Sequence, residues 1–270
     1  MIATFTLPPA SSKRLIAMGV AKMTIVREAI EKGRIIIAGG TTNGFVAEAL
    51  SDLKIEEKAH YTAGIITDAR TCVSDQEMRI SPLCLDKGQP VEVPWEEFLQ
   101  GFGKGDVFIK GANALDHKGR TGVLLGSPTG GTVGAALGIL ASRGSHLVVP
   151  VGHEKMIPSC AVAVKSLGIF KVDQSLGMRA GFIMLPFGEV ITEIQALEQL
   201  YDIEANVVAA GGVGGSEGSV VMAVEGKKTV VEEVLSLVKK LHREKPVTGS
   251  RQKCKGCGVP CNYSIPTPRK

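Results

Sequence analysis

The sequence predicts an α/β protein with a mainly parallel, Rossmann-like sheet flanked by helices, a second, smaller α+β domain of ferredoxin-like type, and an irregular cysteine-containing tail. Three observations predict this organisation. Short β-branched apolar runs alternate with glycine-rich turns and helical patterns in the first part of the chain. After Gly177 the order changes to strand, helix, two strands and helix, and the last residues have no periodicity. We therefore place the domains at 1–178 and 179–245 and the tail at 246–270.

The first unit of the main domain is preceded by a helix over residues 11–29, where apolar side chains recur at helical spacing. Lys32-Gly33 provides its C-terminal stop. Residues 34–38 then form a short apolar run, typical of a strand buried on both faces of a parallel sheet. A turn at 39–43 breaks this run, and residues 44–50 are expected to form a helix. The order is therefore strand, tight turn and helix.

The same order recurs along the chain, which predicts parallel strands joined by right-handed crossovers. Further strands are expected at 106–110, 122–126 and 146–151, and a helix at 133–142. Residues 160–164 fit either a strand or a short helix, and the irregular stretch 62–94 indicates an insertion or a β-rich cap. In the second domain we expect strands at 181–185, 205–210 and 219–224 and helices at 191–201 and 229–241.

Glycine-rich turns at two strand ends are the strongest functional signal. A turn between a buried strand and a helix exposes backbone N–H groups beside the helix N-terminus, which favours an anion. Open α/β sheets bind ligands outside the carboxyl ends of their strands. Tight packing of helix on strand is an alternative reason for the glycines. The candidate ligand-binding residues are Gly39, Gly40, Thr41, Thr42, Asn43, Gly111, Ser127, Thr129, Gly130, Gly131 and Thr132.

The order Ala38-Gly39-Gly40-Thr41-Thr42, then residues 106–116 with Gly119 beyond, then Gly131-Thr132 and a helix resembles the NagB/RpiA-like superfamily. That group includes sugar-phosphate isomerases, CoA-transferases, the sensing half of DeoR-type repressors, regulatory initiation-factor exchange subunits and lactate-utilisation LUD proteins. The resemblance covers roughly residues 11–166. It implies the parallel fold and a crevice for a phosphorylated or CoA-linked metabolite.

The candidate catalytic residues are Lys110, Asn113, Asp116 and His117. Lys110 would neutralise the anion. The resemblance implies an aspartate where Asn113 stands, and an amide cannot accept a proton as a carboxylate does. Asp116 beside His117 either raises the basicity of the imidazole or caps a solvated turn. The pair His153-Glu154, directly after the strand at 146–151, is either a crevice-rim pair or a surface pair.

Three of the six cysteines, Cys254, Cys257 and Cys261, form a CxxCxxxC cluster in the tail. The two thiolates of a CxxC pair can approach one metal ion from a tight turn, so we expect an iron–sulfur cluster or zinc. A fourth ligand would come from Cys160, Cys72, a partner chain or an exogenous group. Redox-active or free thiols are the alternative.

Composition restricts the partners and the compartment. Aromatic residues make up only 4% of the chain and the net charge is only +4, so nucleic acid is not expected. No signal-like N-terminus and no membrane-length apolar run is present, which predicts a cytoplasmic protein without membrane contact. We also expect a homo-oligomer. The Gly211–Gly218 turn lies between two strands and is expected to be a hairpin, with an oligomer contact or a lid as its candidate roles.

Three hypotheses for function follow. The first is an isomerase or transferase-type enzyme that binds a small anionic metabolite, phosphorylated or CoA-linked, in the glycine-rich crevice. The second is a sensor or regulatory module with the same crevice and no turnover, which Asn113 favours. The third is a metal or iron–sulfur protein that works through the tail cysteines.

Overall fold

The computed structural model describes residues 1–254, 257–259 and 261–264. Its centre is a mixed sheet of six strands, and the coarse prediction of an α/β fold is confirmed. In order across the sheet, the strands are β12 (Glu189–Ile191), β10 (His146–Pro150), β7 (Val107–Ile109), β2 (Arg34–Ile37), β5 (Leu83–Asp86) and β6 (Gln89–Val91). The first four are parallel to one another, β5 runs antiparallel to β2, and β6 runs antiparallel to β5.

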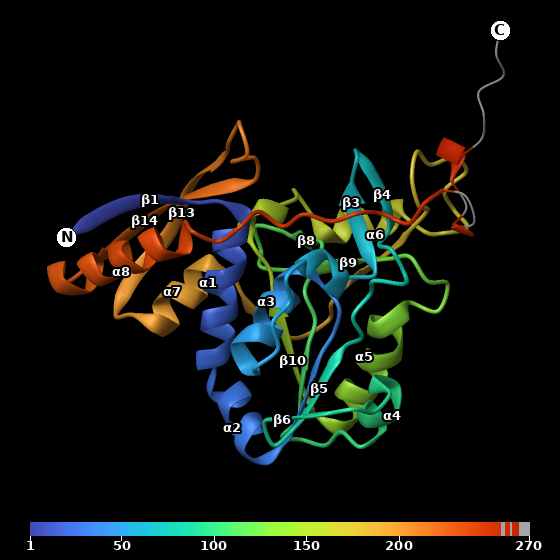
Figure 1. Ribbon diagram of the computed structural model, residues 1–270, viewed down its shortest axis with the longest axis horizontal. Coiled ribbons are helices and arrows are strands. Elements are labelled where there is room, and N and C mark those ends of the chain that lie inside the picture. Colours follow the sequence, from blue (N-terminus) through green and yellow to red (C-terminus); the bar gives the residue numbers. More distant parts are fainter. Residues whose placement is uncertain (255–256, 260, 265–270) are drawn as a thin grey trace, which may run out of the picture.

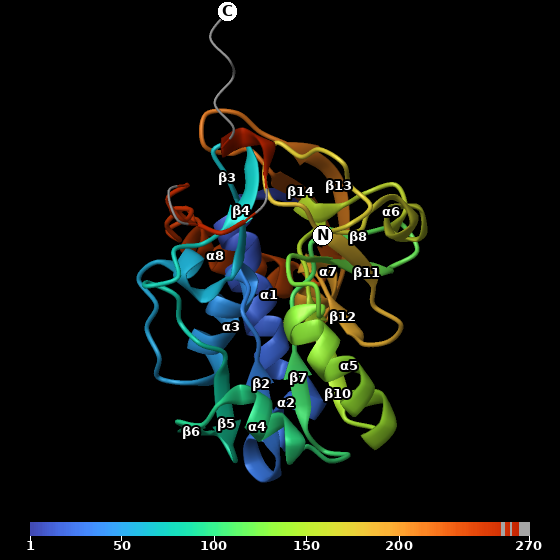
Figure 2. The same cartoon turned by 90° about the vertical axis from the view of Figure 1, so that its right-hand side faces the viewer.

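The central strands β2, β7 and β10 are buried on both faces because, after the first residue of β2 and of β10, all their side chains are apolar. In β2, Ile35 and Ile37 face one hydrophobic core and Ile36 faces the other. A strand with alternate side chains in two cores needs helices on both sides. One side is covered by α1 (Pro9–Lys22), α2 (Thr24–Lys32) and α3 (Thr41–Leu50), and the other by α4 (Trp95–Gln100) and α5 (Gly131–Arg143) (Figure 2).

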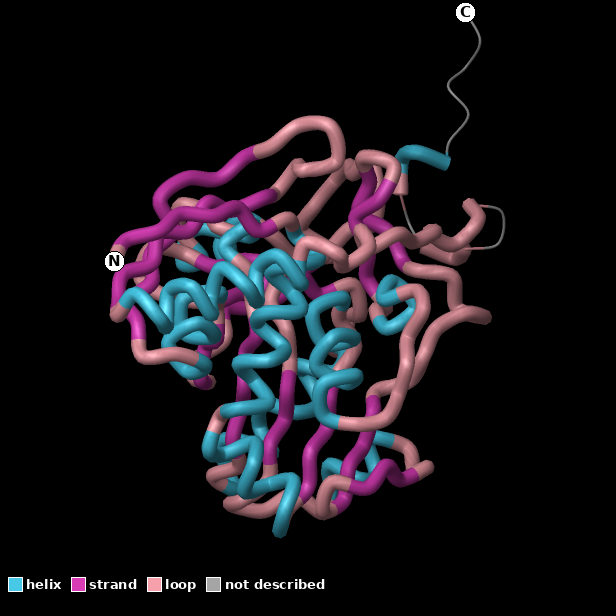
Figure 3. The backbone as a smooth tube through the Cα atoms, turned by 60° about the vertical axis from the view of Figure 1, so that its left-hand side comes forward, coloured by secondary structure: helices cyan, strands magenta, loops and turns pink. Residues whose placement is uncertain are grey.

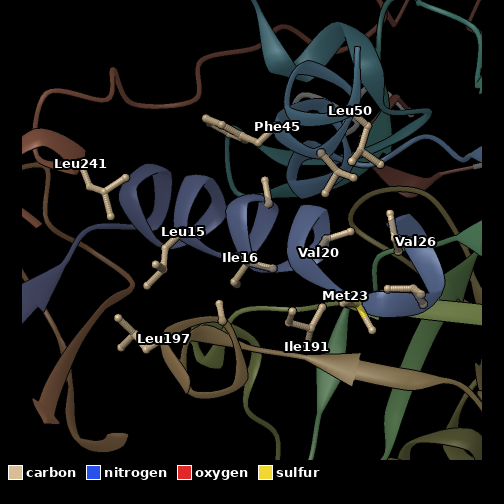
Figure 4. Close-up of a cluster of buried hydrophobic side chains, with 14 of the residues drawn as sticks. Leu15, Ile16, Val20, Met23, Val26, Phe45, Leu50, Ile191, Leu197 and Leu241 are labelled. Atoms are coloured by element: carbon tan, nitrogen blue, oxygen red, sulfur yellow. The ribbon is translucent and has the colours of Figure 1, made fainter. Parts of the chain in front are cut away.

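Helix α1 lies at the centre of the larger core. Its apolar face contacts α3 on one side and α7 (Glu193–Leu200) on another, as the side chains in Figure 4 show. The sequence predicted one helix over 11–29, but the chain turns at Met23, whose ψ of 132° ends α1 and starts α2. Met23 is 6% exposed, so its burial in the core accompanies the break.

A smaller antiparallel sheet combines the N-terminal strand with two strands from the last third of the chain. Its strand order is β1 (Ile2–Leu7), β14 (Ser219–Gly226) and β13 (Ile203–Gly211), with α7 and α8 (Lys228–Leu241) packed against it (Figures 1 and 3). The predicted hairpin of 205–210 and 219–224 is present in it. The first strand of the sequence completes this sheet, whereas β12, from the second half, joins the main sheet.

Two strand assignments from the sequence are wrong. The run at 122–126 was expected in the parallel sheet and that at 181–185 in the small domain. They form β9 (Thr121–Leu125) and β11 (Gly181–Met184), which pair antiparallel with each other beside β8 (Ala114–Leu115). The small sheet therefore has three strands in the described residues, without the fourth of a ferredoxin-like sheet. Apolar runs of this length do not reveal which sheet they join.

The remaining described elements are a hairpin, a short helix and single turns of 3-10 helix. Residues 62–94 contain a hairpin of β3 (Gly64–Thr67) and β4 (Arg70–Val73), followed by β5 and β6 of the main sheet. The stretch around 160–164 is a short helix, α6 (Cys160–Ser166). Single turns of 3-10 helix cover Lys58–Tyr61, His153–Lys155 and Asn262–Ser264. Among the described residues, no helix combines the length and apolar character that crossing a membrane requires.

Candidate functional site

The carboxyl ends of β2 and β7 are joined by the side chain of Asn43. Its amide Nδ2 donates to the carbonyl oxygens of Ala38, at 2.7 Å, and Ile109, at 3.1 Å. Its Oδ1 is buried and has no hydrogen-bond partner. A Cβ on Gly111 would lie 3.4 Å from this oxygen, so the glycine leaves room beside it. The Nδ2 of Asn43 therefore holds the two strand ends together, and its Oδ1 is an unpaired hydrogen-bond acceptor.

The Gly39-Gly40 turn is covered by the 3-10 turn at Lys58–Tyr61. The Gly40 amide donates to the carbonyl oxygen of Tyr61 at 2.6 Å, so that N–H is already used. The Tyr61 hydroxyl in turn donates to Ile37 O at 2.7 Å, and burial raises the pKa of this phenol above its ordinary value. Thr42, in the first turn of α3, is buried, and its Oγ1 has no partner. The turn is thus a packed structure with an unpaired hydroxyl at its edge.

Two lysine amines with lowered pKa values lie beside this turn. Lys110, directly after β7, donates to the carbonyl oxygens of Gly39, at 3.2 Å, and Gly111, at 3.4 Å. Lys155, after β10, donates to Ala112 O at 2.9 Å. Burial lowers the pKa of each amine to about 8. For Lys155, the nearby positive charges of Lys13 and Lys110 lower the pKa further, so the three amines share one region.

Lys13 is held in this region by an ion pair. It extends from the buried face of α1, where its side chain is 8% exposed, and its amine contacts the carboxylate of Glu154. Glu154 also lies close to Gly218, at the base of the β13–β14 hairpin, because a Cβ there would be 3.6 Å from Glu154 Oε2. The end of the hairpin after the Gly211–Gly218 turn is therefore a neighbour of the site.

His153 and Glu193 form a buried pair at the same end of the sheet. Glu193 opens α7 directly after Thr192, whose side chain forms a capping box with Gln195. Its carboxylate is fully buried, and Oε2 accepts from both the backbone N–H and the Nδ1 of His153, at 3.1 and 2.8 Å. Burial alone would raise the pKa of Glu193, but the hydrogen bonds and the charge of His153 outweigh it and hold this pKa below its ordinary value.

This pairing fixes the role of the imidazole. An ionised carboxylate only accepts hydrogen bonds, so Nδ1 of His153 donates and Nε2 is left for another partner. The second carboxylate oxygen of Glu193, Oε1, is buried without a partner, 3.0 Å from where a Cβ of Gly152 would lie. Of the five buried side-chain atoms without a partner in the described residues, three belong to this end of the sheet: Thr42 Oγ1, Asn43 Oδ1 and Glu193 Oε1.

Three predicted catalytic residues lie outside this arrangement. Asp116 is buried and accepts from the Arg120 side chain at 2.8 Å and from the backbone N–H of Cys160 at 3.0 Å. These partners hold the pKa of Asp116 well below its ordinary value although burial acts to raise it. His117 is exposed, and its Nδ1 lies 3.3 Å from Pro158 O. Asn113 is exposed and accepts from the Leu124 amide at 3.0 Å. Asp116 therefore organises its turn.

The second glycine-rich turn is largely exposed. Its Ser127 and Thr129 hydroxyls lie 2.9 Å apart and hydrogen bond to each other. Gly130 and Gly131 both have positive φ, of 80° and 56°, and α5 starts at Gly131, with Thr132 in its first turn. Across the described residues, no hydrogen bond or ion pair joins this turn to the turn at 39–42.

Sequence reasoning missed Lys13, Lys155 and Glu193. A signal for Lys13 was present, since a lysine on the apolar face of an amphipathic helix must find a partner when it is buried. Glu193 follows Thr192 in a capping-box pattern, and this pattern predicts only the start of a helix. Its partner His153 lies 40 residues earlier, and no local pattern reveals that contact.

The cysteine cluster does not form a closed site in the part of the chain that the structure describes. Cys254 is exposed, and Cys257 and Cys261 are partly exposed. No group of three or more His, Cys, Asp or Glu among the described residues is placed to hold a metal ion. Residues 255–256 and 260, within the motif, and 265–270, at the basic end, lie outside the described residues.

A cavity of about 390 Å³ lies away from the strand ends, between α3, residues 54–58 and residues 240–248. It is lined by side chains of both signs, including Glu48, Lys58 and Arg243. None of the residues that line it belongs to the cluster of Lys13, Lys110, Lys155, His153 and Glu193. The mixed charges of its wall do not select one class of ligand.

Comparison of the chain with known proteins gives no match to a family model, to a curated protein or to a solved structure, so its fold and its strand-end residues carry the functional argument.

Proposed function

We propose that the chain is an enzyme that binds a small anionic metabolite at the carboxyl ends of β2, β7 and β10 and transfers a proton through His153. The observation that carries the proposal is the convergence of Lys13, Lys110 and Lys155 on this end of the sheet. Two carboxylates lie among them, but Glu193 is paired with His153 and only Glu154 pairs with one of the three lysines, so the region keeps a net positive charge. Lysines with little water around them bind an anion more strongly than exposed lysines do.

Three unpaired buried atoms at the same end support a polar ligand. Native proteins pair nearly all buried polar atoms with protein or water. Thr42 Oγ1 can donate to an anion, and Asn43 Oδ1 accepts from a hydroxyl. Such a ligand carries both an anionic group and hydroxyls, which fits the phosphorylated metabolites that the NagB/RpiA-like resemblance implies.

The histidine–glutamate pair favours turnover over sensing alone. Glu193 orients the imidazole and stabilises its protonated form, as the carboxylate of a general-base pair does. His153 then removes a proton from the ligand through Nε2, and the amine of Lys110, with a pKa of about 8, stabilises the resulting negative charge. The sensor alternative uses the same residues for binding and lacks the proton step.

The test of binding compares the site lysines with Lys104, which precedes the same strand, β7, that Lys110 follows. Sugar phosphates and acyl-CoAs are screened by thermal shift, and a ligand present at 100 times its Kd stabilises the native state by about 2.7 kcal/mol. We expect Lys110→Ala and Lys155→Ala to weaken binding by about tenfold or more in calorimetry. Lys104→Ala, an exposed lysine before β7, is the matched control and leaves Kd unchanged. The site would be rejected if no anion raised the melting temperature, or if Lys104→Ala weakened binding as much as the site variants do.

The proton step has a separate readout. His153→Ala is expected to keep the Kd within a few fold and to lower turnover by about 10² to 10⁴, the usual contribution of a general base. His146→Ala, at the opposite end of β10, is the control and retains turnover. Ligand binding without any product by mass spectrometry in the wild-type chain would favour the sensor instead.

A further inference from the structure

Lys155 joins the ends of two parallel strands, β10 and β7. It closes the 3-10 turn that follows β10. The backbone beyond it is fixed beside β8, because the Ile157 amide donates to Leu115 O at 2.8 Å and Met156 forms a parallel bridge with Leu115. The side chain of Lys155 returns to the extension of β7, where its amine donates to Ala112 O at 2.9 Å. The amine is therefore held at a defined place between the strand ends.

The carboxylates near the Lys155 amine are paired with other residues. The charged groups that influence this amine are those of Lys13, Lys110, Glu154 and Glu193. Glu154 forms its ion pair with Lys13, and Glu193 forms its own with His153. Among the ion pairs of the described residues, none includes Lys155 or Lys110. Lys155 thus lacks the carboxylate that would hold its proton in place.

A lysine in this position is readily deprotonated. Burial lowers the pKa of Lys155 to about 8, and the positive charges of Lys13 and Lys110 contribute to the decrease. At pH 7 an amine with this pKa is neutral in about one chain in ten, against roughly one in 2,500 for an ordinary lysine of pKa 10.4. Only the neutral amine has a lone pair that can attack a carbonyl carbon. Lys155 is also partly exposed, so its side chain is not sealed from small molecules.

Two features favour Lys155 over Lys110 as a nucleophile. In the described residues the amine of Lys110 is held by two carbonyl oxygens and that of Lys155 by one. Lys155 also ends the 3-10 turn that His153 begins, so one residue separates this amine from the proposed general base. A nucleophilic amine and a residue that transfers protons therefore share one short, rigid turn.

The unpaired acceptor of Asn43 adds a requirement on the ligand. A Cβ on Gly111 would lie 3.4 Å from Asn43 Oδ1 and 3.5 Å from Pro150 O, so this oxygen lies near the end of β10. Gly111 stands between Lys110 and Ala112, whose carbonyl oxygen binds the Lys155 amine. An acceptor at this place suits a ligand hydroxyl. A carbonyl compound that reaches Lys155 would therefore carry hydroxyls as well as an anionic group.

We propose that Lys155 forms an imine with the carbonyl carbon of a small anionic, hydroxylated aldehyde or ketone. The inference rests on the proposed function, because the anion must bind among the lysines before its carbonyl can reach the amine. The neutral amine adds to the carbonyl carbon, and one of its protons moves to the carbonyl oxygen. The resulting carbinolamine takes up one proton from solvent and releases water, which leaves an iminium ion on Lys155.

The iminium ion prepares the proton step assigned to His153. Its positive nitrogen attracts the electrons of the adjacent carbon, so the proton on that carbon becomes more acidic. His153 removes this proton, and the electron pair left behind moves towards the iminium nitrogen to give a neutral enamine. Protonation at another position and addition of water then release the product and restore the Lys155 amine.

The test traps the imine on the full wild-type chain. Dihydroxyacetone phosphate and pyruvate are the carbonyl probes, and sodium cyanoborohydride reduces an imine to a stable secondary amine. We expect the mass of the chain to increase by that of the probe less one oxygen atom, and peptide mass spectrometry to place the adduct on Lys155. Labelling of Lys155 should be at least about tenfold faster than that of exposed Lys104. Absence of an adduct with both probes overturns the proposal, as does an adduct on Lys110 or one spread over exposed lysines.

A matched ligand and a matched variant separate the imine from anion binding. Glycerol phosphate has the same anionic group as dihydroxyacetone phosphate and no carbonyl, so it should slow labelling and form no adduct. Lys155→Arg keeps the positive charge and cannot form an imine. We expect this variant to bind glycerol phosphate within about a few fold of the wild-type Kd and to lose the adduct. Lys104→Arg is the control and retains both properties.

The two proposals fail in different ways. Binding of glycerol phosphate by the wild-type chain without any adduct from the carbonyl probes overturns the imine and leaves the anion site in place. An adduct that persists in Lys155→Arg overturns the assignment to Lys155. If no anion raises the melting temperature of the wild-type chain, the proposed function is rejected and the imine with it.

Discussion

The amine of Lys110 lies at the end of β7, bonded to the carbonyl oxygens of Gly39 and Gly111, and burial lowers its pKa to about 8. In the unfolded chain a lysine has a pKa of about 10.4. Below pH 8 the folded state must therefore hold a proton that it binds more weakly than the unfolded state does. A buried, protonated lysine lowers the stability of the native state. Ligand binding explains its presence here better than folding does.

Replacement of Lys110 by methionine tests this cost. Because the folded pKa is depressed, the stability of the wild-type chain rises with pH between about 8 and 10.4, where the unfolded state binds more protons. We expect Lys110→Met to be stabilised relative to wild type near pH 7, and that difference to fall by about 2 to 3 kcal/mol towards pH 10.5. Urea unfolding at several pH values measures it. Lys104→Met is the control, and a pH-independent difference for Lys110→Met would contradict the explanation.

Site residues differ in how far the sequence could reveal them. The Gly39–Asn43 turn and Lys110 follow strands that local patterns identify, so their place at the strand ends was predictable. Asn113 and Asp116 also lie near a strand end, but Asp116 is used by Arg120 and by the Cys160 backbone. The contact with the Cys160 backbone joins residues more than 40 positions apart, so no local pattern reveals it.

At the scale of elements, α1 packs against α7 through Gly19. A Cβ at Gly19 would lie 2.6 Å from the Cβ and 2.7 Å from the Cα of Ala196, which is closer than real side chains approach. The small residues allow the two helices to meet closely, and α7 carries Glu193 at its first turn. The position of Glu193 beside His153 therefore depends on this helix contact.

Two glycine-to-alanine changes separate packing from helix propensity. Alanine favours a helix over glycine by about 1 kcal/mol. We expect Gly138→Ala, in α5 with open space around its Cβ, to gain about 0.5 to 1 kcal/mol of stability. Gly19→Ala should lose about 1 to 3 kcal/mol because the new methyl group overpacks α7. Chemical denaturation measures both. Equal stabilisation of the two variants would contradict the proposed close contact.

At the scale of the whole molecule, the sequence predicted the layers better than the connections between them. The apolar run Ile35-Ile36-Ile37 predicted a strand buried on both faces, and β2 is buried in this way. The runs that became β9 and β11 have the same local character as β2. Their partners are decided by tertiary contacts, because an apolar strand fits a parallel or an antiparallel position. The same reason explains why the pairing of β1 with β14 could not be predicted from either segment alone.

The interleaving of the two sheets predicts that residues 1–178 and 179–245 do not fold separately. β1 is registered with β14 from Ile2↔Glu225 to Leu7↔Val220, and β12 forms the edge of the main sheet beside β10. Expressed alone, residues 1–178 would expose Phe5 and Leu7 and the α7-facing side of α1. We therefore expect each fragment alone to lack a cooperative thermal transition in circular dichroism.

Co-expression of the two fragments should restore one cooperative transition, because the missing partners of β1, β12 and α1 are then supplied in trans. Residues 1–245, which lack only the tail, serve as the control and should unfold in a single step. Both sheets are complete in that chain. Dispersed amide spectra and a cooperative melt from either fragment by itself would show that the two ranges are independent domains after all. That result would also show that the pairing of Glu193 with His153 is not needed for either fragment to fold, since the two residues lie on different fragments.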